Sequence, residues 1–260
     1  MTFITEVETV LVPERRQAIL DYINKRHSAT VAELSDKFCV GETSIRRDLS
    51  KLSEAGFIRK TYGGAILLPA NNEVIALDAR QHIEEAAKNI IAQKAVSLIK
   101  DGDVIFLDSS STSLRMVPFL KKFNNLSVVT HGLLTAYNLL SLPNIKVYIA
   151  GGFIKSNIRS CSGAFTCGIF SSMYADKVFI SPKAIDRSHG IYCANEEEMN
   201  VRRTMMEYSN MVIMLCNTNK LDQSAQFHLC DLKKINAIVC EKNPCKDWEE
   251  IFSKNHISQI

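Results

Sequence analysis

The sequence of 260 residues has no apolar run close to the roughly 18 residues that a membrane-spanning helix needs. Its beginning, MTFITEVETVLVPERR, lacks the basic segment followed by an apolar core that marks a secretory signal peptide. We therefore expect no membrane partner and a cytoplasmic location. A hydrophobic content of 46% with 23% charged residues is ordinary for a soluble globular protein, and the length allows one large or two medium domains.

Metal-binding spacing is also missing from the sequence. The chain has eight cysteines, but no two of them form a CxxC pair, and no cysteine–histidine cluster has the spacing of a zinc site. Cys216 and Cys240 each end an apolar run, which favours reduced cysteines in a core. We expect neither a structural metal nor a cofactor.

Strong net charge is the third thing the chain lacks. The formal charge is only +3, which argues against a protein that is covered with nucleic acid. A local DNA-binding face remains compatible with this value, because affinity for DNA needs a basic patch rather than a basic protein.

The segment 28–64 contains two short helical patterns with a tight turn between them. In the first, Val31, Leu34 and Phe38 share one helix face. Cys39-Val40-Gly41-Glu42 follows and is too short for anything but a turn. In the second helix the apolar face consists of Ile45, Leu49 and Leu52.

The front of the second helix has the composition of a DNA recognition helix. Arginine suits guanine edges and phosphates because its planar fork donates two hydrogen bonds at once. An amphipathic helix with a solvated charged face is the alternative, and the next segment, Phe57–Leu67, favours DNA binding because it predicts a basic hairpin with a Gly-Gly turn. The candidate DNA contacts are Thr43, Ser44, Arg46, Arg47 and Ser50 on the helix, with Arg59, Lys60 and Tyr62 on the hairpin.

A further helix is predicted over about 13–26, which completes a three-helix unit with a β-wing. Residues 1–12 are expected to form a loose arm, and the turn-rich Pro69–Asn72 marks a domain boundary. The predicted organisation is a DNA-binding domain over 1–68, a linker over 69–80 and a second domain over 81–260.

The second half alternates short apolar runs with helical patterns, which predicts a mainly parallel sheet covered on both faces. The expected strands are 104–107, 126–129, 145–150, 177–180, 211–215 and 237–239, and the expected helices are 82–100, 112–122, 132–141, 195–209 and 246–254.

Polar and small residues follow several of these strands, where ligands bind in such sheets. Hydroxyls and free N–H groups at a helix start can hold a phosphate, although plain N-capping explains the same residues. Similarly, a loop lysine can neutralise a phosphate or simply be solvated. The candidate ligand residues at the strand ends are Asp108, Ser109, Ser110, Ser111, Thr112, Thr130, His131, Gly151, Gly152, Lys183, Asn217 and Lys220.

The stretch SIRRDLSKLSEAGFIRKTYGGAIL resembles the signature of DeoR-family bacterial repressors, close to TIRRDL…L…G…R…HGGA. Ser44 stands for the family threonine, Tyr62 for its histidine, and Gly41 for the usual serine before the helix. FLDSSST, VTHG, Gly151-Gly152, Gly163 and LCNTNK are similar to motifs of the family's C-terminal sensor domain. His131 replaces an asparagine and Asn217 an aspartate.

This resemblance, which covers roughly residues 14–240, implies more than the spacing does. It implies a sensor domain similar in fold to ribose-5-phosphate isomerase, glucosamine-6-phosphate deaminase and CoA transferases, with Arg80 and Lys88 as basic residues that help sense a sugar phosphate. The implied function is repression of a carbohydrate-metabolism operon, relieved by a phosphorylated sugar, in a bacterial protein that is associated with the nucleoid when bound to DNA.

Two other classes of protein compete with this function. A sugar-phosphate isomerase or deaminase with a DNA-binding appendage needs a positioned general base, for which Asp108, His131, Asp186 and Glu196–Glu198 are candidates. An RNA-binding module would need an aromatic stacking platform, which the sequence does not suggest. We expect a non-enzyme that forms a dimer or tetramer, because one small winged helix buries too little surface for tight specific binding.

Overall fold

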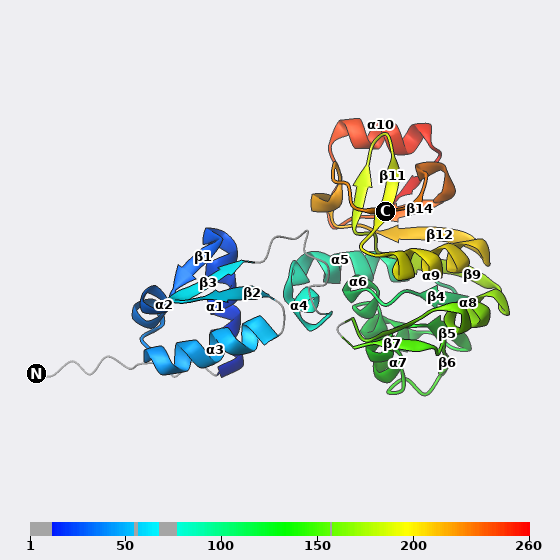
Figure 1. Ribbon diagram of the computed structural model, residues 1–260. Helices are drawn as coiled ribbons and strands as arrows, with labels where there is room; N and C mark the ends of the chain where they lie inside the picture. The colour runs from blue at the N-terminus through cyan, green and yellow to red at the C-terminus, as the bar shows by residue number, and fades with distance from the viewer. Residues whose placement is uncertain (1–11, 55–56, 68–76, 157) are drawn as a thin grey trace, which may run out of the picture. The chain divides into compact units, whose positions relative to one another are not determined.

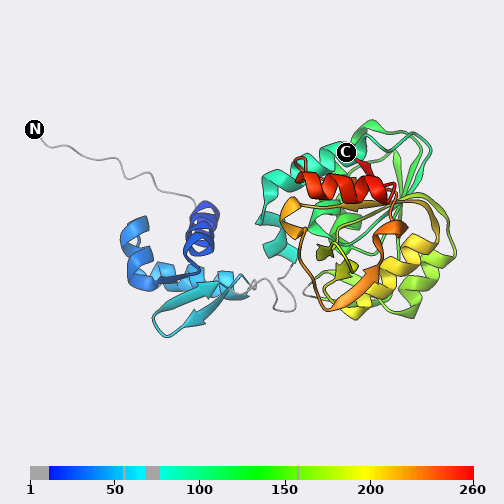
Figure 2. The same ribbon diagram turned by 90° about the horizontal axis from the view of Figure 1, so that it is seen from above.

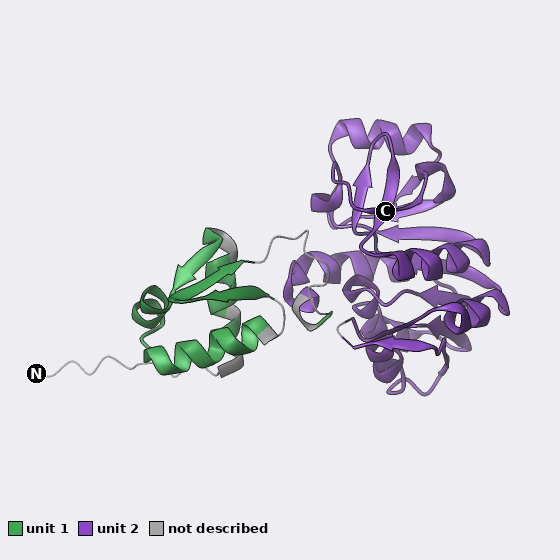
Figure 3. Cartoon of the chain, in the orientation of Figure 1, with its two compact units in different colours: residues 1–79 green, residues 80–260 purple. Residues whose placement is uncertain are grey.

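The computed structural model describes residues 12–54, 57–67, 77–156 and 158–260, and the chain divides into two compact units, 1–79 and 80–260 (Figure 3). The expected N-terminal arm and the Pro69–Asn72 break lie outside the described residues, apart from residue 12. Of the predicted linker 69–80, the last four residues belong to α4, Leu77–His82.

The first unit is a three-helix domain with a small antiparallel sheet, as predicted (Figure 1). Its strands pair in the order β1-β3-β2, and β2 and β3 form the expected hairpin. The short strand β1 was not predicted, because three residues are too few to show an alternating pattern. The elements are α1 Val12–Arg26, β1 Ser28–Thr30, α2 Val31–Phe38, α3 Glu42–Glu54, β2 Ile58–Thr61 and β3 Gly64–Leu67.

Local chemistry fixes the ends of these elements. Thr30 and Glu33 form a capping box that satisfies free N–H groups at the start of α2. Cys39 ends that helix in the left-handed conformation. Gly64 allows β1 to approach β3, because a Cβ atom there would overlap the backbone of Ala29 and Thr30. Gly64 therefore serves the packing of the sheet.

The second unit contains a seven-stranded sheet in the order β15-β14-β12-β9-β4-β5-β6, and every neighbouring pair is parallel. The predicted parallel sheet is thus confirmed. Its strands are β4 Val104–Leu107, β5 Leu126–Thr130, β6 Ile145–Ile149, β9 Ala175–Ile180, β12 Ser209–Leu215, β14 Ala237–Val239 and β15 Ser258–Gln259.

Helices cover both faces of this sheet because successive strand residues point to opposite sides. On β4, Ile105 and Leu107 pack with α5, α6 and α7, while Phe106 packs with α8 and α9 on the other face. Figures 1 and 2 show α10 near the C-terminus. The helices are α5 Glu85–Val96, α6 Ser111–Leu114, α7 Leu133–Leu139, α8 Ala164–Ser171, α9 Glu196–Glu207 and α10 Lys246–Lys254.

Two predicted helices are wrong in their continuity. The helix expected over 82–100 is only α5, Glu85–Val96, because residues 97–100 are not helical and His82 belongs to α4. Glu84 separates α5 from α4 by adopting a left-handed conformation with φ 54°. Apolar periodicity continues across this single residue, so the sequence gives no sign of the break. The helix expected over 112–122 is α6 followed by a 3₁₀ helix, Val117–Lys122, which has a proline in its first turn.

Small sheets and 3₁₀ turns complete the unit. None of the described helices has the length and apolar character needed to cross a membrane. The additional strands are β7 Phe153–Lys155, β8 Ser160–Ser162, β10 Ala184–Asp186, β11 Gly190–Cys193 and β13 Phe227–Cys230, and the additional 3₁₀ helices are Thr218–Lys220 and Leu232–Lys234.

Candidate functional site

Helix α3 has the two faces expected of a recognition helix. Ile45, Leu49 and Leu52 are buried in the core of the first unit. The residues predicted to face outward do so: Thr43, Ser44, Arg46 and Arg47 are exposed and Ser50 is half-buried.

Asp48 anchors this helix from behind. Its carboxylate is buried and accepts hydrogen bonds from Arg15 Nε at 2.7 Å and Arg16 Nε at 2.9 Å, both on α1. Charge-assisted bonds of this kind fix orientation. Sequence reasoning missed this contact, although an aspartate beside the apolar face of the helix was a usable sign of a buried partner.

The wing presents its basic residues to solvent. Arg59, Lys60 and Tyr62 are all exposed, and Tyr62 projects fully from the tip of the β2–β3 turn. Lys60 Nζ donates to Ser50 Oγ at 2.8 Å, which links the wing to the recognition helix. Helix and wing therefore offer one continuous polar surface with several positive charges.

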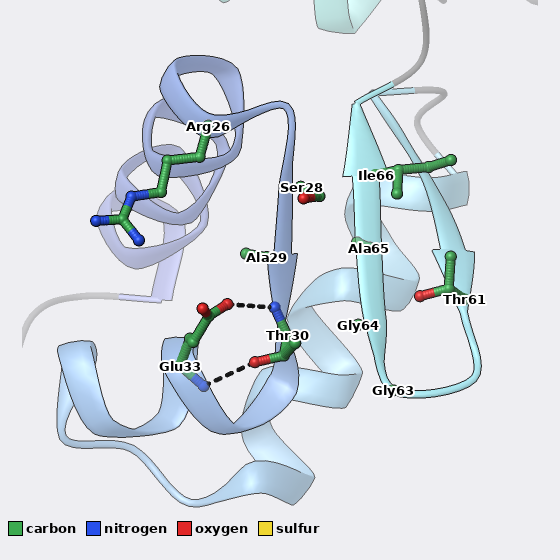
Figure 4. A pocket seen from close by; sticks show the side chains of 10 residues that line it. All are labelled: Arg26, Ser28, Ala29, Thr30, Glu33, Thr61, Gly63, Gly64, Ala65 and Ile66. Carbon is green, nitrogen blue, oxygen red and sulfur yellow. Dashed lines mark hydrogen bonds between the residues drawn. The ribbon is translucent and has the colours of Figure 1, made fainter.

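A groove of about 610 Å³ lies in the first unit, beside β1, β3 and the start of α2 (Figure 4). None of the predicted ligand residues lines it, and its capping-box groups are bonded to each other. We assign no ligand to this groove. Its lining residues are Arg26, Ser28, Ala29, Thr30, Glu33, Thr61, Gly63, Gly64, Ala65 and Ile66.

In the second unit, the polar loops predicted to form a ligand site meet at the carboxyl edge of the parallel sheet. Ser109 N–H, after β4, donates to His131 Nε2, after β5, at 3.1 Å. Ser181 N–H, after β9, donates to Asp108 Oδ2 at 3.0 Å. Lys220 Nζ, after β12, donates to Ser181 Oγ at 2.9 Å and to Pro182 O at 2.8 Å. Four strand ends therefore share one hydrogen-bond network.

Asp108 is the centre of this network rather than an exposed ligand contact. Its fully buried carboxylate lies 2.9 Å from Arg202 Nη2 of α9 and accepts bonds from Ser110 N–H and Ser113 Oγ. Burial alone would raise the pKa of the Asp108 carboxyl, but Arg202 and these hydrogen bonds lower it overall. Arg202 also pairs with buried Glu198 at 3.2 Å. Sequence reasoning missed Arg202.

His131 has a different role from the predicted one. We expected its ring to face a bound sugar, but the ring is buried, Nε2 accepts from Ser109 and Nδ1 contacts Cys161 O at 3.0 Å. Accepting at Nε2 places the proton on Nδ1. Burial lowers the pKa of this imidazole, which keeps it neutral. His131 therefore holds the serine loop in place and has no free nitrogen for a ligand or a base reaction.

The serine loop after β4 combines engaged and unengaged hydroxyls. Ser110 caps α6 by accepting from Ser113 N–H, and Thr112 Oγ1 accepts from Ser181 Oγ at 3.3 Å. Among the described residues, no hydrogen bond involves the hydroxyls of Ser109 and Ser111. These two hydroxyls are therefore available to a ligand.

The remaining predicted strand-end residues mostly shape the loops. Thr130 Oγ1 accepts from Gly132 N–H, and Asn217 Oδ1 accepts from Asn219 N–H. Gly152 has φ +152°, and a Cβ atom there would overlap Thr166 Oγ1, so only glycine fits. Gly151, by contrast, has open space around the position of a Cβ.

Positive charge without matching negative charge surrounds these loops. Arg80 Nε and Nη2 are buried and have no hydrogen-bond partner among the described residues. Lys88 is buried and donates to Arg80 O. Of the residues that the structure describes in this unit, the buried carboxylates are Asp108 and Glu198, and both are paired with Arg202.

Burial and neighbouring cations weaken the protonation of these lysines. Burial first, then Lys220, Arg80 and Arg115, lower the pKa of Lys88 to about 7. Burial likewise lowers the pKa of Lys220 to about 8, and it also lowers the pKa of Lys183. A multiply charged anion that binds beside such desolvated cations stabilises their charged form. No group of three His, Cys, Asp or Glu side chains in the described parts of the chain is arranged to hold a metal ion.

These pKa values predict opposite effects of pH on anion binding and on stability. Between pH 6.5 and 8.5 Lys88 and Lys220 lose protons in the empty protein, so affinity for a phosphate dianion that needs both charges should fall by roughly a hundredfold. The unfolded chain, whose lysine pKa is about 10.4, keeps those protons, so the contribution of both lysines to the free energy of unfolding should rise over the same range.

Calorimetry of sugar-phosphate binding and urea unfolding at both pH values test this pair of effects. Lys88→Met should flatten both profiles, because methionine fills the buried space without titrating. An affinity that is independent of pH in the wild type would contradict the assignment of these lysines to the anion.

Comparison with known proteins identifies both units. Residues 15–70 match the DeoR-like helix-turn-helix domain, and residues 83–242 match the DeoR C-terminal sensor domain. The chain is 31% identical to the HTH-type transcriptional regulator GolR of Listeria innocua, over 88% of this chain and 90% of that protein. It is 30% identical to the HTH-type transcriptional repressor GlcR of Bacillus subtilis, over 95% of each chain. It is also 30% identical to the L-fucose operon activator of Haemophilus influenzae, over 95% of this chain and 98% of that protein.

Solved structures match more weakly. Ribose 5-phosphate isomerase A from Methanocaldococcus jannaschii has a TM-score of 0.40 at 15% identity, over 53% of this chain and 54% of that one. Translation initiation factor eIF-2B from Pyrococcus horikoshii has a TM-score of 0.45 at 16% identity, over 88% of each chain. The matches to the two family models and to these relatives show that the chain belongs to the DeoR family of HTH-type transcriptional regulators.

Proposed function

We propose that this regulator represses a carbohydrate-metabolism operon and releases its operator when a phosphorylated sugar binds. The observation that carries the proposal is the cluster of cations at the sheet edge of a chain that also has a winged helix: buried Lys88, half-buried Lys220, and Arg80 with two buried guanidinium nitrogens that lack a partner among the described residues. Desolvated cations without buried carboxylates of their own favour an anionic ligand. The name of one related protein, the L-fucose operon activator, supports the carbohydrate role, and the name of another, the repressor GlcR, supports repression.

In this proposal α3 enters the major groove of double-stranded DNA, and Arg59 and Lys60 contact its backbone. The phosphate lies against the Ser109–Ser113 loop, at the hydroxyls of Ser109 and Ser111 and the N–H groups of Ser111 and Thr112, because the other N–H groups of the loop already have partners. Arg80, Lys88, Lys183 and Lys220 supply charge. The sugar hydroxyls face Gly151, Gly152 and Asn217. His131 is left out of the contact set because both of its ring nitrogens are already used.

Release follows from linkage between the two sites. Operator and sugar phosphate favour different arrangements of the protein, so each weakens the other's binding by the same factor. A coupling free energy of about 1–3 kcal/mol is typical and changes affinity by roughly 5–150-fold.

The residues at the carboxyl edge of the sheet do not support the alternative that the domain is an enzyme. The most promising base, His131, is buried with no free nitrogen, and Asp108 is held ionised by Arg202. We propose that the sensor domain binds its sugar phosphate without turnover. An assay of isomerase and deaminase activity against the same sugar phosphates tests this, and measurable turnover would overturn it.

Lys220→Ala should weaken sugar-phosphate binding by about tenfold or more, because the bond between an ammonium and a phosphate is charge-assisted. Operator affinity should stay unchanged, so the variant represses but fails to release. Calorimetry and operator binding on the full chain measure the two effects. Lys121→Ala, at an exposed site on the 3₁₀ helix Val117–Lys122, is the matched control.

Equal sugar-phosphate affinity in wild type and Lys220→Ala would remove Lys220 from the site. An unphosphorylated sugar that binds as tightly as its phosphate would overturn the proposed phosphate loop as a whole.

A further inference from the structure

Large apolar side chains are exposed together around one edge of the sheet in the second unit. They come from α7, β6, β7 and the start of α8, and Figure 1 shows α7, β6 and β7 at the same end of the unit. Helix α7 packs against β6 and β8, and β8 pairs with β7, so the elements are contiguous. We call this surface the β6 patch; it consists of Tyr137, Leu140, Tyr148, Ile149, Phe153 and Phe165.

The patch is larger than an ordinary monomer surface requires. Phe165 is 84% exposed, Tyr137 72%, Phe153 70% and Leu140 73%. With aromatic side chains of about 150–250 Å² each, the six residues expose roughly 700–900 Å². The largest apolar patch on a typical monomer is about 300–600 Å². One partner in a standard stable interface buries about 800 Å², so this patch alone has the area of half an interface.

The strand in the middle of the patch has an open edge. Within the described residues, β6 pairs only with β5 and ends the seven-stranded sheet. Edge strands are usually protected by proline or several charges, since their free N–H and C=O groups attract another strand. Strand β6, Ile145-Lys146-Val147-Tyr148-Ile149, has no proline and one charge.

We propose that the β6 patch is the interface with a second copy of this chain, formed around antiparallel pairing of the two β6 strands. A second copy fits because a two-fold axis makes any strand edge complementary to itself. Pairing centred on Val147 places Lys146 opposite Tyr148 of the second copy and keeps the two lysines apart. It also brings the exposed side chains that flank β6 in the two copies toward the joined edge.

This inference rests on the proposed function in one respect, since it assumes an operator with two-fold symmetry. A second copy of the chain supplies the second DNA-binding domain that such an operator needs. Half-sites that are separated by whole helical turns require two winged helices, and one alone covers too little DNA. The sensor domain would thus join the two copies through the outer edge of its sheet, next to the Gly151-Gly152 loop.

Sedimentation velocity of the full chain at micromolar concentration tests the interface. The wild type should be a dimer or a larger assembly built from dimers. A double variant, Tyr148→Glu with Phe153→Glu, should raise the dimer dissociation constant at least a hundredfold, because it places carboxylates at the two-fold axis. Both residues are exposed, so the variant should keep the wild-type circular dichroism spectrum.

Tyr174→Glu is the matched control, since Tyr174 is an exposed aromatic residue outside the patch, and it should assemble like the wild type. A monomeric wild type, or a double variant that assembles as the wild type does, would overturn the proposal. Failure of the proposed function looks different: the double variant would dissociate as expected, but the intact wild-type dimer would bind neither a selected operator nor any sugar phosphate.

Discussion

Replacing Arg202 with leucine is expected to lower the free energy of unfolding of the sensor domain by about 3–5 kcal/mol. Arg202 is buried between Asp108 and Glu198, at 2.9 Å and 3.2 Å from their carboxylates, and both carboxylates are buried as well. Leucine would leave two charges in the interior without a partner, which is far more costly than losing a surface ion pair.

Thermal unfolding followed by circular dichroism measures this effect. A loss of this size in a domain of this length lowers Tm by about 6–20 °C. Arg187→Leu is the control, because Arg187 pairs with Asp222 and Asp247 at an exposed site, and it should lower Tm by a few degrees at most. If Arg202→Leu were as stable as the control variant, the buried charge network would not hold the strand-end loops together.

Arg47→Ala is expected to weaken specific operator binding by about 1–3 kcal/mol, roughly 5–150-fold, if the guanidinium reads a base. The structure separates the two arginines of α3, which the sequence left equivalent. Arg46 pairs with Glu42 one turn earlier at 3.0 Å, whereas Arg47 is exposed and forms no hydrogen bond or ion pair with any described residue. Arg47 is therefore available to DNA without first losing a partner.

Competition between operator and random duplex in a fluorescence anisotropy assay separates the possible roles. Loss against the operator alone indicates a base contact, and equal loss against both duplexes indicates a phosphate contact. Arg46→Ala should have a smaller effect, because Arg46 gives up its pair with Glu42 on binding. Unchanged affinity in both variants would exclude α3 as the recognition helix.

The winged helix could be predicted almost completely from the sequence, because its signals are local. The spacing of Ile45, Leu49 and Leu52 defines a buried face, and whatever lies off that face must be exposed. The parallel sheet could be predicted for a similar reason, since buried strands of this kind are continuously apolar. The strand-end loops then meet because the carboxyl ends of parallel strands lie along the same edge.

What the sequence could not show depends on contacts between distant residues. Arg202 lies 94 positions from Asp108, and nothing near either residue marks the pair. His131 looked like a ligand contact because a polar residue at a strand end has the same sequence signal whether it faces a ligand or supports a loop. The break at Glu84 depends on one left-handed residue in a segment of good helix formers.

The most direct test of the central claim measures operator release. Operator duplexes are first selected from a random pool with the full chain, and a sugar phosphate is found by its effect on Tm. The complex with labelled operator is then titrated with that sugar phosphate, with the same sugar without its phosphate, and with inorganic phosphate. We predict that the sugar phosphate weakens operator binding by roughly 5–150-fold at concentrations where the free sugar has no effect. Operator affinity that stays constant while the sugar phosphate saturates the protein would contradict the account.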